Sequence, residues 1–171
     1  MSRAIGVALE CGPIPDGVVP PDQQSSGQNV VGFLYWFAVV AARLDAPSLD
    51  AFVVDRCELV EAALRQAGWR EPDTPPAWAD GIPIDDRPVA DPDYLAGEAE
   101  YDRIVAQVDA ALPWYNPADG LRTVRGLIGA LEAHPELAEC CDGGVWDLVA
   151  LRYQLEYAER VSTRFHLWVS Y

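Results

Sequence analysis

Thirteen consecutive uncharged residues, from Val30 to Ala42, constrain the fold more than any other stretch of the chain. The run, VVGFLYWFAVVAA, is too short to cross a bilayer, which requires roughly 20 apolar residues. Asn29 or Ser26 can cap a helix at its start, and the Asp45 to Pro47 segment can end it. Because apolar side chains point in every direction around such a helix, we expect other elements to cover it on several sides. The run therefore predicts a core helix over about residues 29–44.

Further helices are indicated by their start and stop residues. Asp55 and Glu58 have the spacing of a capping box, and Gly68 follows as a stop signal. Pro92 and Pro117 each follow an N-cap residue and predict helices to about Leu112 and to just before His134. Residues 145–162 predict one more helix, and a short helical turn begins at Pro47 and Ser48.

Alternating apolar residues near both ends of the chain predict two strands, at about residues 3–10 and 164–171. We expect both strands to belong to one small sheet, with adjacency as one arrangement. The predicted fold is α+β and mainly α-helical, with four to five helices around the central apolar helix. At 171 residues, one globular domain, residues 1–171, is the natural count, with a proline-rich acidic segment at 69–93.

The net charge of −15 is concentrated in one segment. Residues 71–102 contain ten acidic side chains and one arginine, a net charge of −9. Such a field repels nucleic acid and anionic membrane surfaces, and it accelerates encounter with a basic partner. We therefore expect neither nucleic acid nor a membrane among the partners.

The four cysteines, at positions 11, 57, 140 and 141, include no Cys-x-x-Cys pair, and no export signal precedes them. We interpret all four as reduced thiols of a cytoplasmic protein. Cys57 lies on a predicted helix among apolar neighbours, which is typical of a packed cysteine rather than a reactive one.

No motif in the chain specifies a reaction. Phosphate-loop, dinucleotide-binding and nucleophile-elbow patterns are absent, and so is any paired metal-ligand spacing. His166, on a terminal strand without an identifiable nucleophile, is interpreted as a half-exposed structural histidine. We expect no catalytic residue, no metal and no cofactor, which favours a non-catalytic protein.

Apolar anchors are interleaved with the acidic side chains of residues 71–102. A surface of this composition suits a basic protein, because charge steers the encounter and aromatic burial holds the complex. An ordinary solvated acidic loop is the alternative. The predicted partner-binding residues are Trp78, Asp80, Asp85, Asp86, Asp91, Asp93 and Tyr94.

Three stretches carry a family resemblance: PSLDAFV at 47–53, WYNPADGL at 114–121 with the TVRGLI run after it, and RFHL at 164–167. They resemble small acidic bacterial proteins, some of which are immunity proteins that neutralise a toxin made by the same cell. The resemblance covers about a third of the chain and implies no functional residue. The acidic segment has no counterpart in it.

The leading hypothesis is a non-catalytic protein that binds a basic protein, in one form a toxin inhibitor. A small-ligand binder or enzyme is a second hypothesis, with a pocket near the central helix that uses Tyr35, Trp36 and His166. A homo-oligomeric structural protein is the third, and the sequence leaves the oligomeric state open.

Overall fold

The computed structural model describes residues 4–70, 92–136 and 143–170, the side chains of residues 92–95 and 170 excepted. The chain divides into two compact units. Unit 1 comprises Met1–Val54 and Pro113–Tyr171, and unit 2 comprises Asp55–Leu112. The prediction of a single domain stays a prediction.

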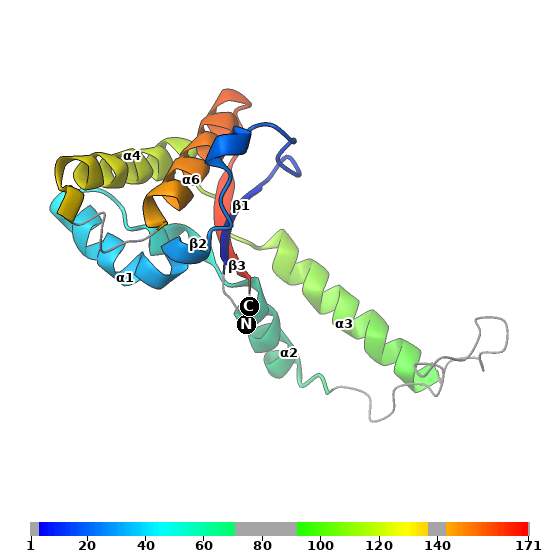
Figure 1. Ribbon diagram of the computed structural model, residues 1–171. Helices are drawn as coiled ribbons and strands as arrows, with labels where there is room; N and C mark the ends of the chain where they lie inside the picture. The colour runs from blue at the N-terminus through cyan, green and yellow to red at the C-terminus, as the bar shows by residue number, and fades with distance from the viewer. Residues whose placement is uncertain (1–3, 71–91, 137–142, 171) are drawn as a thin grey trace, which may run out of the picture. The chain divides into compact units, whose positions relative to one another are not determined.

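Unit 1 contains a three-stranded sheet, three α-helices and two short 3-10 helices among its described residues (Figure 1). In chain order these elements are β1 (Ala4–Leu9), η1 (Pro21–Gln23), α1 (Gln28–Arg43), η2 (Leu49–Phe52), β2 (Val53–Val54), α4 (Pro117–Ala133), α6 (Gly144–Arg160) and β3 (Phe165–Ser170). The α+β, mainly helical fold predicted from the sequence is confirmed.

The two terminal strands are neighbours in the sheet, whose order is β1-β3-β2. β1 and β3 run antiparallel with Ala4 opposite Ser170, while β2 runs parallel to β3. Alternate residues of β1, namely Ile5, Val7 and Leu9, are buried in the core, as the apolar alternation predicts. The sequence did not indicate β2, because two residues are too short to show an alternation.

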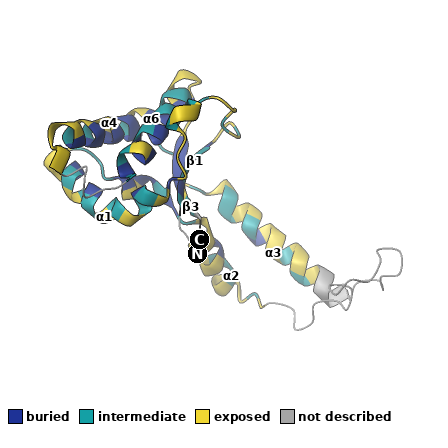
Figure 2. Ribbon diagram, in the orientation of Figure 1, coloured by how far each residue is buried: buried dark blue, intermediate teal, exposed yellow. Residues whose placement is uncertain are grey.

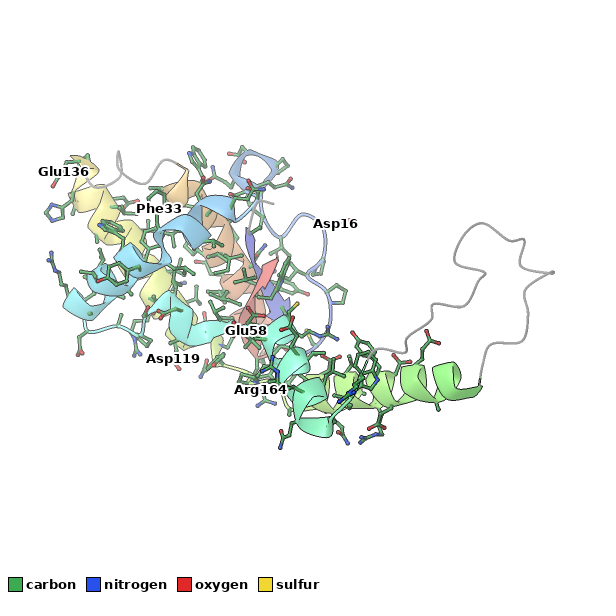
Figure 3. All side chains as sticks on the ribbon, turned by 90° about the horizontal axis from the view of Figure 1, so that it is seen from below. Asp16, Phe33, Glu58, Asp119, Glu136 and Arg164 are labelled. Carbon is green, nitrogen blue, oxygen red and sulfur yellow. The ribbon has the colours of Figure 1, made fainter. Side chains whose placement is uncertain are left out.

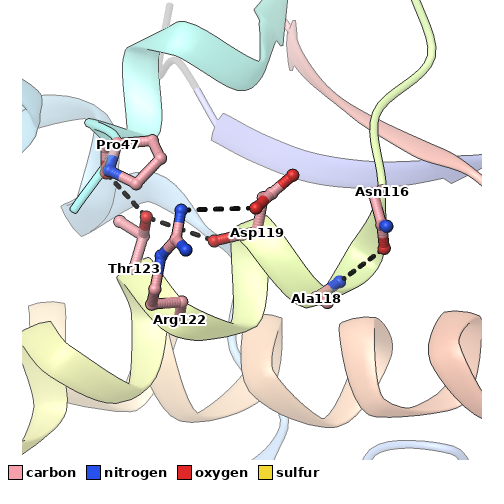
Figure 4. Close-up of polar contacts among 6 residues, drawn as sticks. All are labelled: Pro47, Asn116, Ala118, Asp119, Arg122 and Thr123. Atoms are coloured by element: carbon pink, nitrogen blue, oxygen red, sulfur yellow. Dashed lines mark hydrogen bonds and ion pairs between the residues drawn. The ribbon is translucent and has the colours of Figure 1, made fainter.

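Helices α4 and α6 supply most of the core. Eight residues of α4 and seven of α6 are buried, compared with three of α1. The Asn116 side chain caps α4 as predicted, accepting a hydrogen bond of 3.0 Å from the Ala118 N–H (Figure 4). Two turns later the Thr123 hydroxyl donates to the Pro47 carbonyl at 2.6 Å and links α4 to the segment just before η2.

Helix α1 is buried on one face only. Val30, Phe37 and Ala41 are buried, and described contacts join α1 to α4, α6, β1 and η2. On the opposite face Tyr35 is 85% exposed and Val39 is 40% exposed. Figure 2 shows this mixture of buried, intermediate and exposed residues along α1. The expectation that other elements cover α1 on several sides is confirmed by its contacts with four elements, and the face that carries Tyr35 and Val39 remains exposed.

A buried carboxylate from another helix caps α1. Asp147 of α6 accepts hydrogen bonds from the N–H groups of Asn29 and Val30 at 2.8 and 2.9 Å, and from the Ser25 hydroxyl. The first four N–H groups of a helix lack partners within it, and a negative charge complements its positive end. The predicted caps are corrected here: Asn29 lies inside the helix, and Ser26 makes only a long contact of 3.4 Å to the Gln28 N–H.

Unit 2 contains α2 (Arg56–Ala67) and α3 (Pro92–Ala110), which pack together. Asp55 accepts from the Glu58 N–H at 3.0 Å, as the capping box predicts. Gly68 ends α2 with φ of 68°, as predicted, and α3 begins at Pro92. Among the described apolar residues of this unit, only Val60 and Ile104 are buried. The hydrophobic core of unit 2 is therefore small.

We expect Asp147→Ala to lower the free energy of unfolding by roughly 3 kcal/mol, because two backbone N–H groups and a hydroxyl lose a charged acceptor in the interior. Asp147→Asn keeps one oxygen and should cost less. Asp119→Ala, which removes a half-exposed first-turn acid that pairs with Arg122, serves as the control and should change stability by about 0.5 kcal/mol. Urea unfolding checks all three, and equal losses in Asp147→Ala and Asp119→Ala would contradict the assignment.

Candidate functional site

The predicted partner-binding residues fall mostly outside the described residues. Trp78, Asp80, Asp85, Asp86 and Asp91 lie there. Asp93 and Tyr94 lie in the first turn of α3, where the backbone is described and the side chains are not. The described continuation of the acidic segment is the part of α3 that carries Glu98, Glu100 and Asp102.

Two aromatic rings lie beside these acids. The Trp69 indole N–H donates to the Gly97 carbonyl at 3.0 Å, and its ring lies 5.4 Å from the Tyr101 ring, centroid to centroid. Tyr101 remains 39% exposed, and Glu98 and Asp102 are exposed neighbours of it on α3. We call Trp69, Glu98, Tyr101 and Asp102 the acidic–aromatic face.

Local geometry at the end of α2 positions Trp69. Gly68 adopts the left-handed conformation, and the Trp69 N–H bonds back to the Leu64 carbonyl at 3.0 Å. This is the Schellman arrangement, which directs the residue after the glycine back across the helix end. Gly68 is the stop that the sequence predicts; Trp69 was not predicted as a site residue, although a large apolar residue directly after a C-terminal glycine is a usable signal.

Charge is only partly neutralised on α3. Arg103 forms a two-pronged ion pair with Glu100 at 2.5 and 2.7 Å, and its hydrogen bond lowers the pKa of Glu100 and raises that of Arg103. Arg56 binds Asp109 in the same manner at 2.6 and 2.9 Å, which lowers the pKa of Asp109. Asp102 forms no ion pair with any residue that the structure describes. The acidic–aromatic face thus keeps a net negative charge.

His166 on β3 is buried, which corrects the prediction of a half-exposed histidine. Its ring lies against Trp114, 4.4 Å between centroids, and it bonds to the Pro113 carbonyl. Nδ1 is buried with no hydrogen-bond partner among the described residues. Burial lowers the pKa of this imidazole, and the Pro113 carbonyl opposes the shift in part. The ring is therefore a neutral packing element beside Trp114.

Cavities open on unit 1 beside Asp16 and beside Arg164, two residues that Figure 3 labels. The cavity at Asp16 measures about 270 Å³ and lies between the 14–19 loop and α6. The one at Arg164 measures about 390 Å³ and lies between the ends of α4 and α6. Tyr35, Trp36 and His166, the residues of the alternative pocket, line neither cavity.

Cys11 and Cys57 are free and exposed. The exposure of Cys57 corrects the prediction that it packs among apolar neighbours: its position in the first turn of α2 turns away from the small core of unit 2. Within the described ranges, no group of three or more potential ligands is arranged to hold a metal ion. None of the helices described there is long and apolar enough to cross a membrane.

Comparison of the chain with protein-family models, with curated proteins and with solved structures finds no match.

Burial of His166 makes the stability of the protein pH-dependent. The unfolded imidazole takes up a proton below about pH 6.5, whereas the lowered pKa of the folded ring resists it. The free energy of unfolding should therefore fall as the pH is lowered through about 6.5, since the unfolded state binds more protons there.

His166→Phe should flatten this slope, and His134→Gln, which changes the exposed histidine, should retain it. Chemical unfolding at several pH values measures the slope. An unchanged slope in His166→Phe would show that other groups govern the pH dependence.

Proposed function

We propose that the chain is a non-catalytic protein that binds a basic protein partner through its acidic segment and the adjoining acidic–aromatic face. The observation that supports this most directly is the Trp69–Tyr101 pair, which a hydrogen bond to Gly97 holds in place beside the exposed side chains of Glu98 and Asp102. The proposal also includes the anchors predicted from the sequence, Trp78 and Tyr94 among them, as members of the acidic segment.

Physical chemistry assigns different roles to the two components of this face. Long-range attraction between a chain of charge −15 and a basic protein raises the association rate. Half-exposed aromatic rings add apolar area that a partner can bury, and tryptophan and tyrosine are enriched among residues that dominate binding energy. Charge thus governs encounter, and the aromatic pair slows dissociation.

The toxin-immunity type is the form of this function that we propose, with a basic toxin as the partner and a cytoplasmic location. Its support is the resemblance of the 47–53, 114–121 and 164–167 stretches to small acidic bacterial proteins, some of them immunity proteins. In unit 1 these stretches belong to η2 with β2, to the α4 start and to β3, all of them structural elements. The resemblance therefore supports the type of protein, and the charge supports the kind of partner.

The proposal is tested by capture from a lysate of the source cells with tagged protein at about 50 mM salt and again at about 500 mM. We expect one basic protein in stoichiometric amount, and less of it at high salt because screening shortens the reach of the charges. Glu98→Arg/Asp102→Arg should reduce the affinity for that protein at least about tenfold, measured by titration with the purified partner.

Glu132→Arg/Glu136→Arg is the matched control: it changes two exposed acids four residues apart, near the end of α4, and shifts the net charge by the same amount. Figure 3 labels Glu136 at this position. This variant should bind within about twofold of the wild type. Equal weakening by the two variants would show that only net charge matters, and capture that is insensitive to salt would contradict the basic partner.

A further inference from the structure

A buried imidazole holds the segment that leads into α4 against the sheet. His166 is 6% exposed and lies on β3 between Phe165 and Leu167, which both belong to the hydrophobic core. Successive residues of a strand point to opposite faces, so the His166 ring lies on the outer face of the sheet. The Trp114 ring covers it there, with 4.4 Å between the ring centroids and 34° between the ring planes.

The two nitrogens of the His166 ring have different surroundings. The imidazole donates a hydrogen bond to the Pro113 carbonyl. Nδ1 is buried and has no hydrogen-bond partner among the described residues, so the donor is Nε2. A neutral imidazole with its proton on Nε2 keeps an unshared electron pair on Nδ1. This closed contact with Pro113 and Trp114 therefore fits the neutral ring and offers no acceptor to a second N–H group.

The strands beside His166 supply no countercharge for a protonated ring. Its partner on β1 is Ala8, and the two residues of β2 are valines. The charged side chains near the same end of β1 and β3 are Glu10 and Arg164, which form a two-pronged ion pair with each other at 2.5 and 2.7 Å. Burial and the Pro113 carbonyl are the causes of the lowered pKa of His166, and no charged group is among them.

The segment that covers His166 supplies no countercharge either. Residues 113–118 contain the Tyr115 phenol as their one titratable side chain, and the next acid, Asp119, pairs with Arg122. Burying a charge without a partner is costly. A second proton on the His166 ring therefore destabilises the closed contact.

We propose that His166 is a pH-sensitive switch: uptake of a proton at Nδ1 releases Pro113 and Trp114 from the outer face of the sheet, while the rest of unit 1 stays folded. Release stops at Tyr115, which exchanges two backbone hydrogen bonds with Phe165 at 2.7 and 3.0 Å. On the other side of the contact, Pro113 is already exposed. The segment can thus move without breaking the core.

The direction of the switch follows from the two protonation equilibria. A released and hydrated imidazole titrates near pH 6.5, whereas the pKa of the closed ring is lower. The ratio of released to closed protein therefore rises as the pH falls below about 6.5, by at most about tenfold per pH unit. The inference does not depend on the proposed binding function, because these residues belong to unit 1 and the acidic–aromatic face belongs to unit 2.

An NMR titration of the isotope-labelled full chain, from about pH 8 to about pH 4.5, tests the proposal across the range in which histidine changes its charge. We expect the nuclear Overhauser cross-peaks between the His166 and Trp114 rings to disappear as His166 takes up its proton. The Trp114 indole N–H signal should move over the same transition to the position of a hydrated indole. The Tyr115 amide should stay protected from hydrogen exchange, and the far-ultraviolet circular dichroism should stay unchanged.

His166→Phe keeps an aromatic ring that cannot take up a proton, so the Trp114 indole signal of this variant should be constant over the range. His134→Gln is the matched control, because it removes an exposed histidine and should leave the transition at the wild-type midpoint. Cross-peaks that persist when His166 is protonated would overturn the proposal, and so would a Trp114 transition that remains in His166→Phe. Protonation of His166 that occurs only together with loss of the helical signal would also overturn it, because the release would then be global unfolding.

Discussion

The fold of unit 1 depends on one buried carboxylate. Asp147 lies in the first turn of α6 and accepts two N–H groups from the first turn of α1, so one negative charge serves the positive ends of two helices. The approach is close: a Cβ on Gly143, before α6, would clash with the side-chain amide nitrogen of Asn29. Gly27, just before α1, carries the backbone past β1, where its carbonyl accepts from the Ile5 N–H at 3.0 Å. β1, α1 and α6 therefore meet at the N-terminus of α1.

Local signals made most of the secondary structure predictable. Asn116 with Pro117, Asp55 with Glu58, and Gly68 act on their own helices through hydrogen bonds of a few residues' span, so their spacing in the sequence suffices. The alternation of Ile5, Val7 and Leu9 likewise reports the buried side of β1. Two terminal strands in one sheet can be neighbours, and this predicted arrangement is confirmed by the antiparallel pairing of β1 with β3.

What the sequence could not show depends on residues far apart in the chain. The acceptor for the α1 N-terminus lies more than a hundred positions away, and β2 is a strand only because β3 lies beside it. Trp69 reaches Gly97 across a gap of 28 residues, which explains why the acidic–aromatic face was not predicted although its acids were counted. His166 is buried partly because the Trp114 ring lies against it, and the sequence spacing of these two residues does not predict that contact.

The two units differ in the size of their hydrophobic cores and in the charge that they expose. In unit 2 the small core of Val60 and Ile104 suffices because α2 and α3 are also tied by the Arg56–Asp109 pair and the Trp69–Gly97 hydrogen bond, leaving acids exposed. Unit 1 buries its apolar residues deeply and leaves one uncharged helix face outside. Charge is thus absent from the exposed positions of α1 between Gln28 and Ala42, while α3 carries exposed acids at Glu98 and Asp102.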